Sequence, residues 1–188
     1  MKEQLPSLAE LDLSSYCLFL DRDGVINKPI VDDYAKRPED FVFTPNAIEA
    51  LQILSVRFKY IFIVTNQQGI GRELMSEEDL EDVHLKMYKA LKNNNIEWFD
   101  SLFYAPYLRS EEHPWRKPST GMVQKALDYA PEIDPSKCIV VGDSPGDMAL
   151  ADGIQAIKVR ISNPQFEFDN QTYRFDSLHD FALNLTQI

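Results

Sequence analysis

The chain has 188 residues, of which 44% are hydrophobic, and a formal net charge of −11 at pH 7. This length suits one domain with a substantial core, and the apolar content excludes an intrinsically disordered protein. The excess of acidic side chains argues against a general nucleic-acid binder, because such proteins need clustered lysine and arginine to displace counterions.

Short apolar runs alternate with helical periodicity along the chain. In chain order, the pattern predicts strands over residues 16–20, 60–65, 102–104, 138–142 and 156–160, and helices over residues 48–54, 80–91, 122–130 and 178–185. Ser76 and Asp79 form a capping-box-like start to the second helix, within which we interpret His84 as a packing residue. The nearly continuous apolar strands predict a doubly wound α/β fold, a parallel sheet flanked by helices.

The N-terminal residues contain no signal-peptide core, and no apolar run reaches the length of a membrane span. Cys17 and Cys138 both lie in strand-like apolar runs, so we expect buried, reduced thiols rather than a disulfide framework. Together these features predict a cytoplasmic protein that does not bind a membrane.

Two aspartates follow the first predicted strand. Asp21 and Asp23 are two residues apart, so in an extended segment both side chains point the same way. Like charges this close are costly unless a cation lies between them. The pair therefore indicates a magnesium-dependent phosphoryl-transfer site, with an acidic turn helped by Gly24 as the alternative.

Polar residues also follow the other predicted strands, and the carboxyl ends of parallel strands meet at one edge of a sheet. Thr65 and Asn66 end the second strand, and Lys117 precedes the third predicted helix. The fourth strand leads into Asp143 and Asp147. Asp147 could support a metal ligand, pair with Lys117, or lie on the outer face of a helix.

The order Asp-x-Asp-Gly, Thr-Asn, Lys and Gly-Asp-x-x-x-Asp resembles the haloacid dehalogenase (HAD) superfamily of phosphatases. The resemblance implies a single Rossmann-like domain over residues 1–188, with its core at about residues 14–161 and a C-terminal extension at 162–188. Residues 21–27, 65–70 and 116–122 look like the branch of heptose 1,7-bisphosphate phosphatases and histidinol phosphatases, which have no large cap domain. The second stretch is also similar to polynucleotide 3′-phosphatases.

This resemblance implies a role for each matching residue. Asp21 would attack phosphorus, and Asp23 would act as general acid and base. Thr65, Asn66 and Lys117 would bind the phosphoryl oxygens, and Arg116 would contact the rest of the substrate. Magnesium would be held by the Asp21 and Asp143 carboxylates and the Asp23 carbonyl.

The chain departs from the branch at two places. Many members carry a zinc loop, but the matching positions here hold Ala105-Pro106-Tyr107 and His113-Pro114-Trp115, which offer only His113 as a ligand. Because structural zinc needs four protein ligands, we predict no bound zinc and expect Tyr107 and Trp115 to hold the loop by packing. Ser144 stands where a substrate-binding lysine is common, so the site loses a cation, and we predict Ser144 as a substrate-binding residue in its place.

The resemblance implies a magnesium-dependent phosphomonoester hydrolase of carbohydrate metabolism, with an aspartyl-phosphate intermediate and a small phosphorylated substrate such as D-glycero-D-manno-heptose 1,7-bisphosphate. A histidinol-phosphate phosphatase, a polynucleotide 3′-phosphatase and a non-catalytic phosphate-binding protein stay open as alternatives. We expect a monomer without a nucleic-acid partner. Lys36, Arg37 and Arg72 are further candidates for substrate contact.

Overall fold

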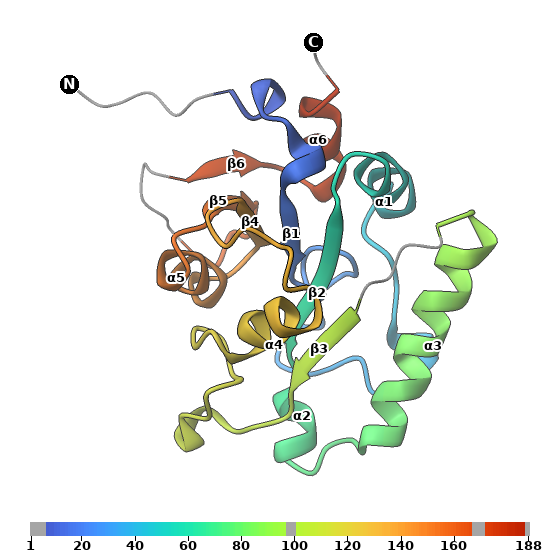
Figure 1. Cartoon of the computed structure of the whole chain (residues 1–188). Coiled ribbons are helices and arrows are strands. Elements are labelled where there is room, and N and C mark those ends of the chain that lie inside the picture. Colours follow the sequence, from blue (N-terminus) through green and yellow to red (C-terminus); the bar gives the residue numbers. More distant parts are fainter. Residues whose placement is uncertain (1–6, 97–100, 167–171, 187–188) are drawn as a thin grey trace.

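The computed structural model describes residues 7–96, 101–166 and 172–186. Within these ranges, six parallel strands form one sheet in the order β3-β2-β1-β4-β5-β6 (Figure 1). The strands are β1 (Cys17–Leu20), β2 (Tyr60–Asn66), β3 (Ser101–Ala105), β4 (Cys138–Gly142), β5 (Ile157–Ile161) and β6 (Tyr173–Phe175). The strand order reverses at β1, and ligands of such sheets bind outside the carboxyl ends near this switch point.

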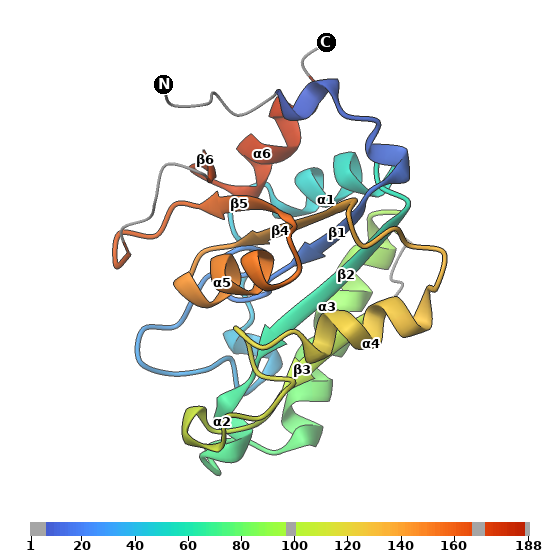
Figure 2. The same ribbon diagram turned by 60° about the vertical axis from the view of Figure 1, so that its left-hand side comes forward.

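Helices cover both faces of the sheet (Figure 2). One face carries α1 (Ala47–Ser55), α3 (Glu77–Asn93) and α6 (Leu178–Asn184), and the other carries α4 (Gly121–Tyr129) and α5 (Pro145–Gly153). A short helix, α2 (Gln68–Gly71), follows β2 directly. Short 3-10 turns are η1 (Leu8–Glu10), η2 (Leu13–Ser15), η3 (Pro38–Asp40) and η4 (Arg109–Glu111).

The central strand β1 shows why the strands are apolar throughout. Leu18 and Leu20 belong to the buried cluster beneath α1, α3 and α6, whereas Cys17 and Phe19 belong to the cluster beneath α4 and α5. Successive side chains of a strand point to opposite faces, so a sheet covered on both faces needs apolar residues at every position. The doubly wound α/β fold predicted from the sequence is confirmed.

Helix α3 begins with the predicted capping box. Ser76 Oγ accepts a hydrogen bond from the Asp79 N–H at 3.1 Å, and the Asp79 carboxylate accepts one from the Ser76 N–H at 2.8 Å. These bonds satisfy two N–H groups that the start of a helix leaves without helical partners. The helix thereby has a fixed start beside β3.

The five strands and four helices predicted from the sequence are all present among the described residues. The sequence pattern did not predict β6, because three residues are too few to show an alternation. It gave no bounds for α2, which has four residues, or for α5, which lacks a clear apolar stripe. Cys17 and Cys138 are buried as expected, and they are register partners on β1 and β4. None of the helices described is both long and apolar enough to cross a membrane.

The C-terminal part of the chain is built into the fold. β6 pairs with the edge strand β5, and α6 packs against α1. Leu178 and Phe181 belong to the same buried cluster as Leu18. We therefore propose that the described part of residues 162–188 completes the domain rather than extending it.

Phe181→Ala should lower the free energy of unfolding by about 3–5 kcal/mol, because it leaves a cavity at a fully buried position. Urea unfolding followed by tryptophan fluorescence measures this change. Leu183→Ala, on the same helix but 37% exposed, is the matched control and should cost less than about 1 kcal/mol. Equal effects of the two substitutions would show that α6 lies outside the cooperative core.

Candidate active site

The predicted site residues come together at the carboxyl-terminal edge of the sheet. Asp21 follows β1, Thr65 lies near the end of β2, and Asp143 follows β4. Lys117 reaches the same edge from the loop before α4, and its Nζ lies 2.8 Å from Asp21 Oδ1. Segments far apart in the sequence therefore meet in one small volume.

Lys117 is a buried cation between two acids. Its Nζ donates to Asp21 Oδ1 at 2.8 Å and to Asp147 Oδ1 at 2.7 Å, and its side chain is 3% exposed. Burial alone would lower the pKa of Lys117, but the charges of Asp147 and Asp21 raise it above its usual value. The lysine is therefore charged at neutral pH.

Asp21 is held from one side of its carboxylate. Oδ1 accepts hydrogen bonds from Lys117 Nζ and from the Arg22 N–H, the latter at 2.7 Å. Burial raises the pKa of Asp21 well above its usual value; Lys117 opposes this shift, and the charges of Asp147 and Asp143 add to it. A further positive charge beside Asp21 would favour its ionised form.

Asp143 lies against the turn that follows Asp23. Gly24 has φ +84°, and a Cβ at this position would overlap Asp143 Oδ2, so only glycine fits. Asn163 Nδ2 donates to the same oxygen at 2.9 Å. Burial and the charge of Asp147 raise the pKa of Asp143 to about 6. The hydrogen bond from Asn163 and the charge of Lys117 act in the opposite direction and lower this pKa.

The acidic cluster fits a divalent cation. Asp21, Asp143 and Asp147 each offer a carboxylate oxygen, and these atoms lie within 4.8 Å of one another. Three buried carboxylates face the single ammonium of Lys117, so their charge is only partly balanced. Carboxylate oxygens are the ligands that Mg²⁺ prefers in proteins.

Asp147 uses both carboxylate oxygens within the protein. Oδ1 accepts from Lys117, and Oδ2 accepts from the Ser144 N–H at 3.1 Å and the Ser144 hydroxyl at 2.5 Å. Of the roles left open from the sequence, pairing with Lys117 is therefore the one that the geometry favours. The Ser144 hydroxyl, predicted to bind substrate, donates to Asp147 at the start of α5.

The Asp23 carboxylate accepts hydrogen bonds from three side chains. Arg22 Nη2 lies 2.9 Å from both oxygens, Asn27 Nδ2 lies 2.9 Å from Oδ1, and Gln67 Nε2 lies 2.8 Å from Oδ2. Burial would raise the pKa of Asp23, but the Arg22 charge and these hydrogen bonds lower it below its usual value. The resting carboxylate is therefore ionised.

Arg22 is itself bound by a histidine of α3. Arg22 Nη1 lies 2.9 Å from His84 Nε2, and both side chains are buried. Burial and the Arg22 charge lower the pKa of His84 to about 3, although the Asp23 charge acts in the opposite direction. His84 is therefore neutral at physiological pH and does more than fill space in the core.

Thr65 and Asn66 occupy different positions in the site. Thr65 is buried, and its hydroxyl oxygen accepts a hydrogen bond from Gln67 at 2.9 Å, so its proton can be donated elsewhere. The Asn66 side chain instead binds the Lys117 backbone: Oδ1 accepts from the N–H at 2.9 Å and Nδ2 donates to the carbonyl at 3.1 Å. This pairing fixes the Lys117 backbone beside β2.

Arg116 lies among other arginines at the rim of the site. Burial lowers the pKa of Arg116, the charges of Arg109 and Arg72 lower it further, and Tyr34 acts in the opposite direction. The segments that carry the other two arginines are joined, because the Arg109 N–H donates to Gln68 Oε1 at 2.8 Å. We call Arg72, Arg109 and Arg116 the arginine rim.

Lys36 and Arg37 are paired within their own loop. Lys36 Nζ lies 2.8 Å from Asp33, and Arg37 Nη2 lies 3.5 Å from Asp40. These are partly exposed ion pairs, which contribute little to stability. The pairing supports a surface position for both cations rather than a substrate contact.

Packing and hydrogen bonds hold the loop in which zinc ligands were missing. Tyr107 and Trp115 pack against the buried cluster beneath α4, as predicted from the sequence. The rings of Tyr107 and His113 stack with 17° between their planes, and Arg116 Nη1 donates to the Tyr107 carbonyl at 3.2 Å. The absence of zinc stays a prediction.

Several residues of the site had no role assigned from the sequence. Arg22, Asn27 and Gln67 lie inside the motif stretches, and their polar side chains beside buried strands were the available signal. Asn163 had no such signal, because it lies in an irregular segment far from the motifs along the chain. His84 resembled an ordinary core residue of an amphipathic helix.

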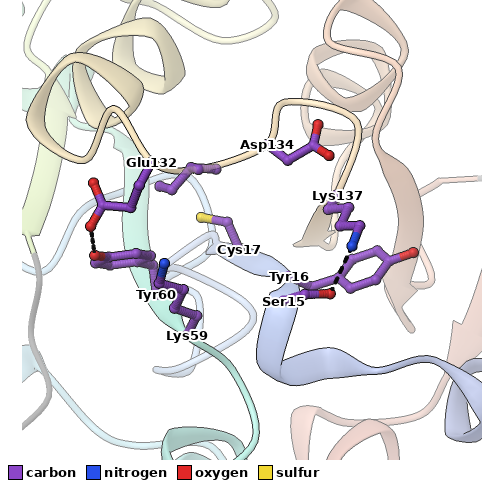
Figure 3. Close-up of a pocket in the computed structure, with 9 residues that line it drawn as sticks. Ser15, Tyr16, Cys17, Lys59, Tyr60, Glu132, Asp134 and Lys137 are labelled. Carbon is purple, nitrogen blue, oxygen red and sulfur yellow. Dashed lines mark hydrogen bonds between the residues drawn. The ribbon is translucent and has the colours of Figure 1, made fainter.

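A cavity of about 200 Å³ lies at the opposite, amino-terminal edge of the sheet (Figure 3). Its lining includes Tyr60 and Lys137 but none of the predicted site residues. Tyr60 donates a hydrogen bond to Glu132, and Lys137 donates one to Ser15. Because its polar groups bind one another, and the acidic cluster found among the described residues lies at the other edge, we place the chemistry at the carboxyl-terminal edge.

Comparisons with known proteins show that the chain is similar to phosphatases. The profile of the family described as Polynucleotide kinase 3 phosphatase matches residues 17–185. A D-glycero-alpha-D-manno-heptose-1,7-bisphosphate 7-phosphatase of Mycobacterium tuberculosis is 37% identical over 180 residues, which cover 94% of each chain. A D-glycero-beta-D-manno-heptose-1,7-bisphosphate 7-phosphatase of Neisseria meningitidis is 27% identical over 90% of this chain and 94% of its own.

A solved structure adds a ligand-bound neighbour. The crystal structure of D,D-heptose 1,7-bisphosphate phosphatase from B. bronchiseptica, complexed with magnesium and phosphate, matches with a TM-score of 0.82. It is 25% identical and covers 92% of this chain and 98% of its own.

The buried, neutral His84 predicts a pH dependence of stability. Its pKa is about 3 in the folded protein and near 6.5 when unfolded, so protons bind the unfolded chain more tightly. Stability is therefore lost as the pH falls below about 6.5. Between pH 7.5 and pH 5, the unfolding free energy of the wild type should fall by about 2 kcal/mol more than that of His84→Gln. Parallel pH profiles from chemical denaturation would contradict this.

Proposed function

The chain belongs to the polynucleotide kinase 3 phosphatase family within the HAD superfamily, and from this premise we propose that it is a magnesium-dependent phosphatase that removes the 7-phosphate of D-glycero-D-manno-heptose 1,7-bisphosphate. The observation that carries the proposal is the contact of Lys117 with Asp21 and Asp147 beside Asp143. This arrangement joins a potential nucleophile, a phosphate-binding cation and a metal-binding cluster.

Asp21 is the proposed nucleophile. Lys117 and the Arg22 N–H hold Oδ1, which orients the carboxylate so that its other oxygen can attack phosphorus. The bond from phosphorus to the sugar oxygen then breaks, and an aspartyl-phosphate forms on Asp21. One difficult hydrolysis is thereby divided into two easier steps.

Asp23 is the proposed general acid and base. In its protonated form it gives a proton to the leaving sugar oxygen. As a carboxylate, it then takes a proton from the water that attacks the aspartyl-phosphate, which releases phosphate and restores Asp21. The ion pair with Arg22 favours the carboxylate and so supports the second of these roles.

The phosphoryl oxygens would have donors from the end of β2 and from the loop before α4. The Thr65 hydroxyl can donate its proton because its oxygen already accepts from Gln67, and Lys117 supplies a fixed positive charge. We propose the Asn66 backbone N–H as a third donor. A magnesium ion held by the Asp21 and Asp143 carboxylates and the Asp23 carbonyl would neutralise charge on the phosphoryl group.

The arginine rim favours a substrate with a second anionic group. The charges of Arg72 and Arg109 act on Arg116, which directly precedes Lys117, in a chain whose formal net charge is −11. Arginine is suited to bidentate recognition of phosphate, and three of them provide more charge than a single transferred phosphoryl group needs. The rim therefore replaces the cation that Ser144 does not supply, and it fits the 1-phosphate of a heptose bisphosphate.

The anomer and the setting of the enzyme are parts of the same proposal. The relative that is 37% identical is named for the alpha anomer, so we propose the alpha anomer as the substrate of this chain. We also propose a monomer in the cytoplasm, without a nucleic-acid partner. The acidic net charge supports the last point.

Asp21→Asn should lower kcat by about 10³-fold or more, because the amide oxygen is a poor nucleophile. The measurement is phosphate release with magnesium from heptose 1,7-bisphosphate of each anomer, histidinol phosphate and a 3′-phosphorylated oligonucleotide. Asp128→Asn on the exposed side of α4 is the control and should keep full activity. Full activity of Asp21→Asn, or a preference for histidinol phosphate or the oligonucleotide, would refute the corresponding part of the proposal.

Arg109→Ala should lower kcat/KM for the bisphosphate by about 10- to 100-fold, as expected for the loss of one charged hydrogen bond. For heptose 7-phosphate, which lacks the second phosphate, the loss should be less than about threefold. Arg57→Ala, at the end of α1 near the opposite edge of the sheet, is the matched control. Equal losses on both substrates would show that the rim does not read the second phosphate.

A further inference from the structure

Arg22 is the largest fully buried side chain among the described residues. Its guanidinium contacts two side chains: Nη1 lies 2.9 Å from His84 Nε2, and Nη2 lies 2.9 Å from both Asp23 oxygens. Arg22 Nε has no hydrogen-bond partner within the described part of the chain. The buried cation therefore bridges a helix of the core to one acid of the site.

A purely structural role would not need an arginine at this position. An apolar side chain of similar size would fill the core without the cost of moving a cation out of water. Arg22 instead pairs with Asp23, whose side chain is 34% exposed and reachable from outside. This pairing fixes the orientation of the Asp23 carboxylate, which is useful if that orientation matters for the reaction.

His84 fixes the other end of the bridge. Arginine has no acceptor atom, so His84 Nε2 must accept the hydrogen bond, and Nδ1 carries the imidazole proton. The imidazole lies on α3, with its ring centroid 6.3 Å from that of Tyr104 on β3. A neutral imidazole on a helix with a fixed start can accept a hydrogen bond from the guanidinium. A protonated imidazole could not accept this bond and would repel the guanidinium.

We propose that His84 is a positioning residue for the reaction: through Arg22 it holds the Asp23 carboxyl group in the orientation from which a proton passes to the leaving oxygen of the substrate. This inference rests on the proposed function, in which Asp23 is the general acid. In that step the Asp23 O–H bond and the bond from phosphorus to the leaving oxygen break, while the bond from Asp21 to phosphorus and the new O–H bond on the leaving group form. Asn27 and Gln67 also bind the carboxylate, but Arg22 adds the charge and the link to α3.

The leaving group separates a positioning role from a structural one. A sugar alcohol is a very weak acid and needs the proton from Asp23 to depart, whereas 4-nitrophenol departs readily as its anion. The ratio kcat/KM reports the steps up to the first irreversible one, so later hydrolysis of the aspartyl-phosphate does not enter it. A misplaced general acid should therefore lower kcat/KM for the sugar phosphate but not for 4-nitrophenyl phosphate.

His84→Leu removes the acceptor and keeps an apolar side chain in the core. It should lower kcat/KM for the heptose bisphosphate by about 10- to 100-fold and for 4-nitrophenyl phosphate by less than about threefold. His84→Gln, whose Oε1 can accept from Arg22, should recover most of the activity on the bisphosphate. Met87→Ala is the matched control, because it disturbs the same buried helix face without removing a hydrogen bond to Arg22, and it should leave the ratio of the two activities unchanged.

Equal losses on the two substrates in His84→Leu, or no loss on either, would overturn the inference. If His84→Leu does not fold, Arg22→Lys gives the second test, because lysine keeps the charge but cannot bridge Asp23 and His84 with a planar fork. The same selective loss is then expected, and an unchanged activity ratio would contradict it. A wild-type protein that cleaves no phosphomonoester would instead refute the proposed function itself.

Discussion

The site depends on one buried ammonium group. Lys117 lies between Asp21 and Asp147, and Asp143 adds a third carboxylate to the same volume. Removing this charge would leave buried carboxylates unpaired, which costs several kcal/mol in proteins, roughly 3–5 for a broken buried pair. With it, the cluster still carries excess negative charge, which suits a divalent cation and an anionic substrate bound together.

The remaining contacts keep that ammonium group and its acids in place. Asn66 binds the Lys117 backbone on both sides, which ties the loop before α4 to the end of β2. Ser144 binds the second oxygen of Asp147, so that acid is directed at the lysine rather than at solvent. The sheet provides the frame, because parallel strands deliver these loops to a single edge.

The sequence predicted the sheet and the acidic cluster because both depend on local patterns. Buried parallel strands need unbroken apolar runs, and the acids of the cluster directly follow such runs, as Asp21 and Asp143 do. It failed where a role depends on tertiary contact alone. Asn163 reaches Asp143 from a segment without a pattern, and His84 differs from a packing residue only through its bond to Arg22. The side chain of Asn66 likewise forms hydrogen bonds with the Lys117 backbone, a contact that the spacing of residues along the sequence does not predict.

We expect the cluster around Lys117 to bind one divalent cation. Isothermal titration of Mg²⁺ into the wild type and Asp143→Asn, with Asp128→Asn as the control, tests it without any substrate. We predict that the wild type and the control each bind one Mg²⁺ per chain. The Mg²⁺ affinity of Asp143→Asn should be about 10- to 100-fold weaker. Equal Mg²⁺ affinity in all three proteins, or no binding by the wild type, would contradict it.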